Sequence, residues 1–96
     1  MADGYVMLFL DVHDAERYRT YLDEATPTVI AQGGRFLVAS DRPDVIEGTW
    51  PAGRTIVIKF ASVAAARAWY ASASYAPLVA DRQAAAESVV AIFEGA

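Results

Sequence analysis

Apolar residues occupy both faces of three short segments of the chain. Successive residues of a β-strand point to opposite faces of its sheet, yet every position from 5 to 10 is apolar. Residues 54–60 place Ile56 and Ile58 on one face and Val57 on the other, and residues 89–93 are apolar throughout. These segments therefore predict strands that are buried on both faces.

A helical pattern follows the first of these segments. Its apolar positions recur at helical spacing at Tyr18, Tyr21, Leu22, Ala25 and Val29. Asp14 is placed to cap the helix at its N-terminus, and Gly33 is placed to end it. Pro27 either kinks the helix or begins a second segment capped by Thr26.

A second helical region separates the last two apolar segments. Ser62 is placed to cap a helix that runs to about Ser72. Ser74 is placed to cap another helical stretch, which has Pro77 in its first turn and continues to about Glu87.

The predicted elements follow the order β, α, β, β, α, β. The predicted strands are residues 5–12, 35–40, 54–60 and 89–94, and residues 45–48 form a short extra strand or a continuation of the second one. This order predicts an α+β, ferredoxin-like fold with a four-stranded antiparallel sheet and helices on one face. We expect residues 1–96 to form one such domain.

The second apolar face of the sheet requires a cover, because helices on one side leave the other side exposed. An apolar patch of that size is unusual on a monomer, and the same face of a second copy would cover it symmetrically. Long side chains from the loops are the alternative cover. The loops are short, so we expect a homodimer whose two sheets pack together.

The composition excludes several classes of function. The net charge is −4, and the only lysine is Lys59, so a nucleic-acid-binding surface is not expected. The chain has no cysteine and one histidine, so we predict no disulfide, no metal site and no bound cofactor. The apolar run near the N-terminus is too short for a signal peptide or a membrane span. We expect a cytoplasmic protein that does not bind membranes.

Two polar groups lie at the ends of the predicted strands. His13, between Asp11 and Asp14, is either an acid/base group oriented by a carboxylate or an exposed loop residue. Asp11 and Arg35 are expected to form an internal ion pair, which is either structural or part of a pocket.

Further polar and aromatic residues are candidates for a binding site. Glu47 either faces a cavity or is a charge that protects an edge strand. Trp50, Trp69, Tyr70 and Tyr75 either line a pocket or belong to the core, and the core is the better interpretation for Trp69. Arg82 lies seven residues after Tyr75, on the same helical face, and either binds a carboxylate or forms a surface salt bridge.

Three ordered motifs resemble those of a widespread bacterial family of small proteins of unknown function. This family belongs to the dimeric α/β-barrel superfamily and has a ferredoxin-like fold. The motifs are Pro27-Thr28-Val29 with Gly33-Gly34-Arg35-Phe36-Leu37-Val38, Ile46-Glu47-Gly48-Thr49-Trp50 with Arg54-Thr55-Ile56-Val57-Ile58, and Ala68-Trp69-Tyr70 with Ser72, Tyr75 and Arg82.

The resemblance implies a dimer but no settled reaction. Proteins of the same architecture include cofactor-independent monooxygenases, lactone isomerases and stress-response barrel proteins, although fold does not determine function. The resemblance gives no support to His13. Family members often have arginine and glycine where this chain has Ala39 and Ser40, and an acid where it has Ser74. The positions that it supports are Tyr21, Arg35, Glu47, Trp69, Tyr75 and Arg82.

These residues lead to a hypothesis about function. We expect a homodimer that binds a small organic acid, with Arg35 and Arg82 holding the anion and Glu47 as the acid/base group. Catalysis would be an isomerase, lyase or monooxygenase step without a cofactor. A non-catalytic ligand sensor and a structural dimerisation module are the alternatives. The residues expected to shape the pocket are Tyr21, Trp50, Trp69 and Tyr75.

Overall fold

The computed structural model describes residues 2–51 and 53–96 and shows four strands with helices between them. The predicted βαββαβ order is confirmed. Its elements are β1 (Gly4–Val12), α1 (Ala15–Ala31), β2 (Arg35–Ser40), β3 (Arg54–Phe60), α2 (Val63–Tyr70), the 3₁₀ helix η1 (Ala76–Leu78), α3 (Val79–Ala85) and β4 (Ala86–Glu94).

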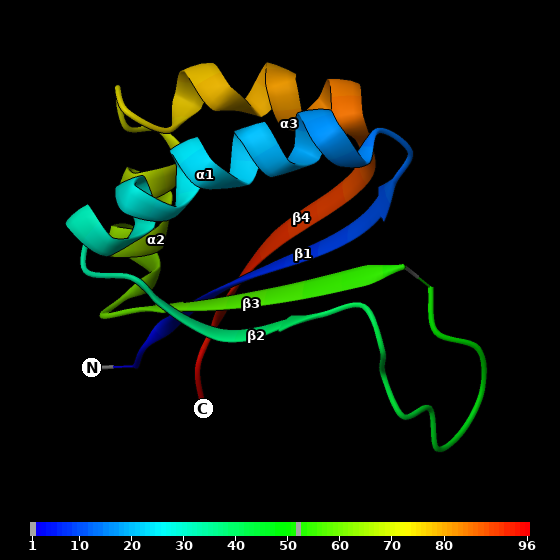
Figure 1. Ribbon diagram of the computed structural model, residues 1–96. Helices are drawn as coiled ribbons and strands as arrows, with labels where there is room; N and C mark the ends of the chain where they lie inside the picture. The colour runs from blue at the N-terminus through cyan, green and yellow to red at the C-terminus, as the bar shows by residue number, and fades with distance from the viewer. Residues whose placement is uncertain (1, 52) are drawn as a thin grey trace.

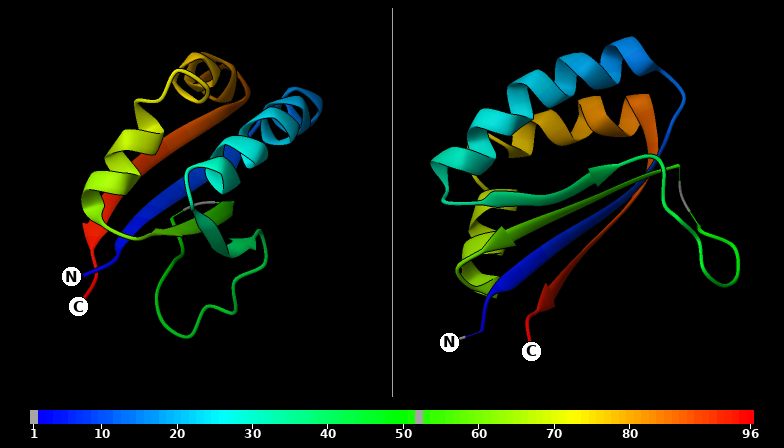
Figure 2. Two further views of the ribbon diagram at one scale, coloured as in Figure 1. Left: turned by 90° about the vertical axis from the view of Figure 1, so that its left-hand side faces the viewer. Right: turned by 60° about the horizontal axis from the view of Figure 1, so that its bottom comes forward.

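The four strands form one antiparallel sheet in the order β2-β3-β1-β4. All three α-helices lie on one side of this sheet (Figure 1), and two further views show the same two-layer arrangement (Figure 2). This is the predicted ferredoxin-like α+β fold. The opposite face, which we call the helix-free face, has no element of the described chain packed across it.

Helix α1 begins and ends where local chemistry predicts. The Asp14 side chain accepts a hydrogen bond from the Arg17 amide at 3.1 Å, which satisfies one of the free N–H groups of the first turn. Gly33 has a φ of 78°, a conformation that glycine adopts without steric cost. Pro27 lies within a single continuous helix, so no second segment begins at Thr26.

The second helical region differs from the prediction at its end. Ser62 caps α2 by accepting a hydrogen bond from the Ala65 amide at 3.0 Å, as predicted. Ser74 caps nothing, because its hydroxyl pairs with the hydroxyl of Ser72 at 3.3 Å. Strand β4 begins at Ala86, three residues earlier than predicted, because its first residues pair with the end of β1 as far as Val12.

The extra strand predicted at residues 45–48 is wrong. Residues 41–51 are exposed and irregular, because no neighbouring strand offers them backbone partners. Gly48 has a φ of 76°, which interrupts an extended conformation. The loop projects from the sheet on its helix-free side (Figures 1 and 2).

The ion pair predicted between Asp11 and Arg35 is also wrong. Leu10 pairs with Arg54 at one end of β3, whereas Arg35 pairs with Lys59 at the other end. Asp11 and Arg35 therefore lie at opposite ends of the sheet. Asp11 instead accepts a hydrogen bond from the Gly53 amide at 2.7 Å.

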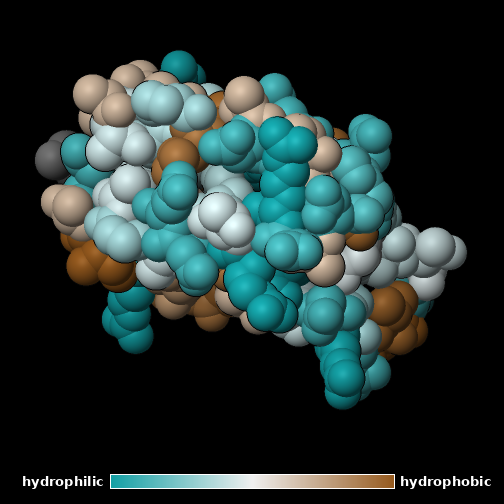
Figure 3. Space-filling model, turned by 45° about the horizontal axis from the view of Figure 1, so that its top comes forward, coloured by the Kyte–Doolittle hydropathy of each residue, from teal (hydrophilic) through white to brown (hydrophobic). Residues whose placement is uncertain are grey.

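The core lies between the helices and the inner face of the sheet. The strands contribute alternate residues to it, as the pleat requires, and helices α1, α2 and α3 cover them. Figure 3 shows that mainly hydrophilic side chains cover the outer, helical side of the molecule. The buried apolar core residues of the strands are Val6, Leu8, Leu10, Ile56, Ile58, Phe60 and Ala86.

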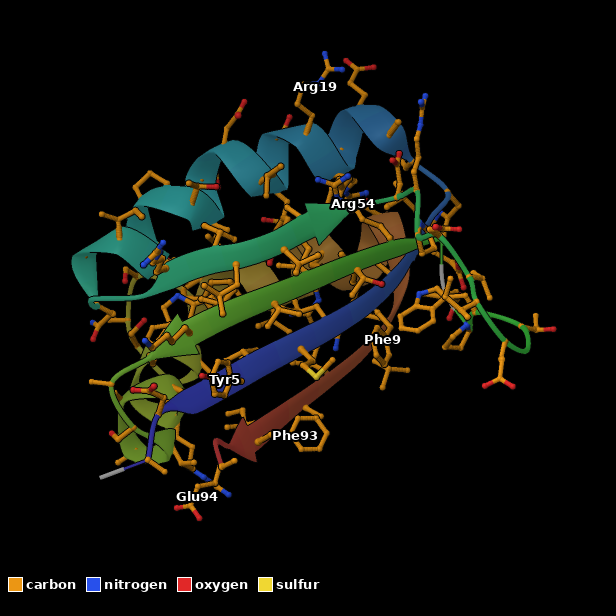
Figure 4. All side chains as sticks on the ribbon, turned by 90° about the horizontal axis from the view of Figure 1, so that it is seen from below. Tyr5, Phe9, Arg19, Arg54, Phe93 and Glu94 are labelled. Atoms are coloured by element: carbon orange, nitrogen blue, oxygen red, sulfur yellow. The ribbon has the colours of Figure 1, made fainter. Side chains whose placement is uncertain are left out.

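The helix-free face carries apolar side chains that the rest of the described chain leaves at least partly exposed. Tyr5 and Phe9 on β1 and Phe93 on β4 lie along this face (Figure 4). Val89 and Phe93 are 64% and 53% exposed. The strands are therefore apolar on both faces, as the sequence indicates.

None of the helices described here is both long and apolar enough to cross a lipid bilayer.

Candidate functional site

A buried cluster of tyrosines surrounds one arginine beneath helices α1 and α3. We call Tyr21, Tyr70, Tyr75 and Arg82 the tyrosine–arginine cluster. Arg82 Nη1 donates to the Tyr75 hydroxyl at 2.8 Å, and Arg82 Nη2 lies 3.5 Å from the Tyr70 hydroxyl. The Tyr21 and Tyr75 hydroxyls are 2.7 Å apart. These side-chain hydrogen bonds thus connect helix α1, the segment before η1, and helix α3.

Arg82 is unusual because its charge is buried without an acid beside it. Only 2% of the residue is exposed, and no carboxylate forms an ion pair with it among residues 2–51 and 53–96. Its Nε atom is buried and has no hydrogen-bond partner. The tyrosine hydroxyls are therefore the groups that solvate this guanidinium, and their loss would leave a buried charge unsatisfied.

Burial favours the neutral forms of Tyr21 and Tyr75. It raises the pKa of Tyr21 well above its usual value, and the neighbouring Tyr75 hydroxyl raises it further. Burial also raises the pKa of Tyr75, although hydrogen bonds and the positive charge of Arg82 act in the opposite direction. Both hydroxyls therefore keep their protons at neutral pH.

Trp69 packs the cluster against the sheet. Its ring centroid lies 4.0 Å from that of Tyr75, and its Nε1 donates to the Thr28 hydroxyl at 3.0 Å. Thr28 in turn donates to the Ala25 carbonyl at 2.7 Å. Since Trp69 is 1% exposed, the core interpretation of this residue is the one that the structure supports.

An open cleft of about 560 Å³ lies beside the cluster, between α1 and the adjoining ends of the sheet strands. We call it the α1 cleft. Its volume is in the range of small-molecule sites in proteins. It is lined by Leu10, Val12, Ala15, Tyr18, Arg19, Leu22, Asp41, Gly53 and Arg54.

Two cations and one acid line the α1 cleft. Arg54 at the start of β3 lies between α1 and the sheet, whereas the Arg19 side chain extends from the outer side of α1 (Figure 4). Neither forms an ion pair within the described ranges. Asp41 is the one carboxylate of the lining. The cleft therefore offers a net positive charge against apolar walls, which suits a small organic anion.

Two polar atoms of the cleft residues lack partners. Tyr18 Oη and Arg54 Nε are buried and make no hydrogen bond with any described residue, and the Arg54 guanidinium lies 5.9 Å from the centre of the Tyr18 ring. Burial raises the pKa of Tyr18, although the positive charge of Arg54 opposes this shift. Tyr18 is thus a neutral hydrogen-bond donor without an acceptor.

The α1 cleft and the tyrosine–arginine cluster are adjacent. The rings of Tyr18 and Tyr21, one turn apart on α1, have centroids 5.8 Å apart. The cluster therefore forms the support behind the cleft wall, which fixes the orientation of Tyr18.

The seven residues that were predicted to form one pocket do not all lie together in the folded structure. Tyr21, Trp69, Tyr75 and Arg82 meet in the buried region described above. Arg35 is exposed at the start of β2, and Glu47 is exposed in the loop of residues 41–51. The hypothesis that Arg35 and Arg82 hold one anion within a single chain therefore has no geometric support.

Trp50 lies at the helix-free face. Its Nε1 donates to the Thr55 hydroxyl at 3.0 Å, and its ring meets the ring of Phe9 edge-on, with the centroids 5.9 Å apart. It packs the loop of residues 41–51 against β1 and does not line the α1 cleft.

Sequence reasoning did not select the residues of the α1 cleft. A signal was present at Arg54, because alternation places it on the same face as the buried Ile56 and Ile58. A cation on the buried face of a strand is rare without a reason. No such signal marked Arg19 or Asp41, since both positions read as ordinary surface residues.

His13 gains no functional surroundings from the fold. The residue is exposed, and its backbone amide donates to the Ala85 carbonyl at 3.0 Å. Within the described ranges, no three His, Asp or Glu side chains gather in a manner that could hold a metal ion.

Comparison with known families gives one match that covers nearly the whole chain. The model of the family described as "Domain of unknown function (DUF1330)" matches residues 3–96. No curated protein matches the sequence.

Solved structures resemble the fold at low sequence identity. A protein of unknown function from Rhodopseudomonas palustris, RPA0582, has a TM-score of 0.79 and 18% identity, over 99% of this chain and 83% of that one. The cofactor-independent oxygenase SnoaB from Streptomyces nogalater has a TM-score of 0.71 and 15% identity, over 97% and 92%. A dimeric ferredoxin-like protein of unknown function from Jannaschia sp. CCS1 has a TM-score of 0.69 and 13% identity, over 96% and 98%.

Proposed function

The chain belongs to the DUF1330 family, and we propose that it is a homodimer in which each subunit binds a small organic anion in its α1 cleft. The anion site is inferred mainly from Arg19 and Arg54, which line a cleft with apolar walls. Neither arginine forms an ion pair with another described residue. The Tyr18 ring lies beside Arg54 in the wall of the cleft, with its hydroxyl buried.

The lining indicates which part of a ligand binds where. A carboxylate or phenolate group would accept hydrogen bonds from the Arg54 guanidinium, whose planar shape suits two-point contact. The apolar remainder of the ligand would lie against Leu10, Val12 and Leu22.

An enzymatic role is the second candidate function, and one feature of the cleft favours it. Asp41 adds a carboxylate to the lining that contains Arg19 and Arg54, so the cleft contains a proton acceptor together with groups that stabilise an anion. This combination suits the removal of a proton from a bound acid. The similarity to a cofactor-independent oxygenase makes an oxygenation, isomerisation or lyase reaction without a cofactor the class to test.

The homodimer is supported by the uncovered helix-free face. Phe93, Val89 and Phe9 form part of an apolar surface along β1 and β4, and a second copy of the same face would bury it symmetrically. The similar protein from Jannaschia sp. CCS1 is described as dimeric. A structural dimer with an empty cleft remains the alternative that a binding experiment must exclude.

Binding of benzoate, with benzamide as its neutral counterpart, tests the anion site. We expect benzoate to shift the backbone amide NMR signals of Tyr18, Leu22 and Arg54, and benzamide to shift them at least about tenfold more weakly at equal concentration. The Arg54→Gln variant should lose the benzoate response.

Arg67→Gln is the matched control, because Arg67 is exposed on α2 and does not line the cleft. It should retain the benzoate response in full. Equal responses to benzoate in the Arg54→Gln variant and the unmodified protein would contradict the proposed site, as would a benzoate response confined to residues outside the cleft.

A further inference from the structure

The charges on the helix-free face are separated between its two ends. Asp11 and Glu87 are register partners at one end, and alternation places them on the same face as Phe9 and Val89. We call this the acidic end. The loop of residues 41–51 adjoins it, since that loop precedes Arg54, the partner of Leu10.

Basic residues occupy the opposite end of the same face. Arg35 and Lys59 are register partners there, and Lys59 also pairs with Tyr5 of β1. Asp3 lies 3.5 Å from Lys59, whereas Arg35 is exposed and forms no ion pair within residues 2–51 and 53–96. We call this the basic end.

The loop of residues 41–51, which we call the acidic loop, extends the acidic end beyond the sheet. It carries Asp41, Asp44 and Glu47 against Arg42. Its apolar Ile46 is 83% exposed, and the loop projects on the side that a second sheet would occupy (Figure 2). The packing of its Trp50 on Phe9 makes it continuous with the apolar face.

Two copies of the helix-free face can pack on each other in two symmetric ways. The two arrangements differ in whether the acidic end of one sheet meets the acidic end or the basic end of the other. A twofold axis parallel to the strands places the same ends together and opposes β2 with β4, so the acidic loop would approach Glu87 of the partner subunit. An axis across the strands exchanges the ends and opposes β2 with β2. The acidic loop then meets the end of the partner sheet where Arg35 and Lys59 lie.

We propose that the dimer axis runs across the strands, so that each acidic loop contacts Arg35 and Lys59 of the partner subunit. This inference rests on the proposed homodimer and specifies its geometry. The first arrangement places each acidic loop against Glu87 of the partner subunit, whereas the second places it against two cations and so pairs opposite charges twice in every dimer. The second arrangement also brings Asp11 toward Asp3 of the partner subunit, but Lys59 already offsets the charge of Asp3. Complementary charges of this kind fix the register of an interface.

The arrangement also links the partner subunit to the α1 cleft. Asp41 begins the acidic loop and lines the cleft, and Asp11 holds the amide of Gly53, another lining residue. A loop that is fixed by the partner subunit would therefore keep this wall of the cleft in place.

Cysteine cross-linking distinguishes the two axes, because the natural chain has no cysteine. We would treat the Glu47→Cys/Arg35→Cys and Glu47→Cys/Glu87→Cys variants with a short bismaleimide and measure the covalent dimer on a denaturing gel. Residue 35 begins β2 and residue 47 lies in the loop beyond the other end of that strand, so a short reagent is expected to join them only between subunits. The three single-cysteine variants are the controls.

We expect a covalent dimer from Glu47→Cys/Arg35→Cys that exceeds those of the single variants, and none from Glu47→Cys/Glu87→Cys. The reverse pattern would overturn the proposed axis, and so would the absence of both products from a protein that sediments as a dimer. A protein that sediments as a monomer and yields no product would overturn the homodimer as well, which separates the two failures.

Charge reversal provides a second measurement in solution. Glu47→Arg and Arg35→Glu should each weaken dimerisation, by about tenfold or more, because each change places like charges together twice per dimer. The double variant should recover most of the lost affinity. Glu24→Arg, on the exposed side of α1, is the matched control and should leave dimerisation unchanged. Failure of the double variant to recover would contradict the proposed contact.

Discussion

The guanidinium of Arg82 donates a hydrogen bond to the hydroxyl of Tyr75 at 2.8 Å, inside the core and without an ion-pair partner among the described residues. A hydroxyl is a weaker partner than a carboxylate, so the cation depends on several tyrosines at once. The relationship also explains why α1 and α3 pack closely, because Tyr21 of α1 lies 2.7 Å from the same Tyr75 hydroxyl.

Removal of Arg82 should strongly destabilise the protein. Arg82→Ala leaves a cavity and removes a donor from the buried Tyr75 hydroxyl and from the partly buried Tyr70 hydroxyl, so we expect the free energy of unfolding to fall by about 3 kcal/mol or more. Urea unfolding measures this change. Arg67→Ala, at an exposed position of α2, is the matched control and should change the stability by no more than about 0.5 kcal/mol. Similar values for the two variants would contradict the structural role of the cluster.

The raised pKa of Tyr21 predicts a loss of stability in alkali. The unfolded chain ionises its tyrosines near pH 10, whereas burial keeps Tyr21 protonated in the folded protein. Since the folded state then holds more protons, the free energy of unfolding must fall as pH rises above about 10. The stability contributed by this shift is fully present below that pH.

Replacement of Tyr21 separates this effect from general alkaline unfolding. Tyr21→Phe removes the titrating group and the hydrogen bond to Tyr75, so we expect a loss of about 1 kcal/mol at pH 7. The decrease of stability above about pH 10 should be shallower in Tyr21→Phe than in the unmodified protein. Parallel pH curves from urea unfolding would show that Tyr21 does not carry the effect.

The close contact between Gly4 and the N-terminus of α2 predicts a site that tolerates no side chain. A Cβ atom at Gly4 would collide with the backbone carbonyl of Ser62 and lie 2.7 Å from the amide nitrogen of Val63. We expect Gly4→Ala to lower the stability by about 2 kcal/mol in thermal or urea unfolding. Gly53→Ala, whose Cβ would lie 3.2 Å from an Asp11 carboxylate oxygen, should cost clearly less. Equal costs would mean that β1 and α2 are less tightly packed than described.

The fold could be predicted from the sequence because its strands carry a clear alternating pattern. Val6, Leu8 and Leu10 meet the helices, and the same pattern predicts the apolar side chains of the opposite face. Capping chemistry at Asp14 and Ser62 located two helix starts correctly. These signals are local, so a single sequence contains them.

The candidate site could be predicted only in part because it depends on register. Tyr21, Trp69, Tyr75 and Arg82 are near one another through helix packing. Their spacing indicated only that Tyr75 and Arg82 share a helical face, and the family resemblance supported all four positions. The position of Arg35 relative to Asp11 depends on which residues pair across β3, and no local pattern contains that information. Residues 45–48 favour a strand by composition, but a strand also requires a neighbour with free backbone groups.

The homodimer through the helix-free face is the central claim, and sedimentation equilibrium tests it most directly. We expect the unmodified protein to sediment at twice the 10.3 kDa of the chain at micromolar concentration. Phe93→Asp should convert it to a folded 10.3 kDa monomer, because Phe93 is half exposed in one chain and a charge there is desolvated only in the dimer. A 10.3 kDa monomer for the unmodified protein, or an intact dimer for the Phe93→Asp variant, would contradict the claim.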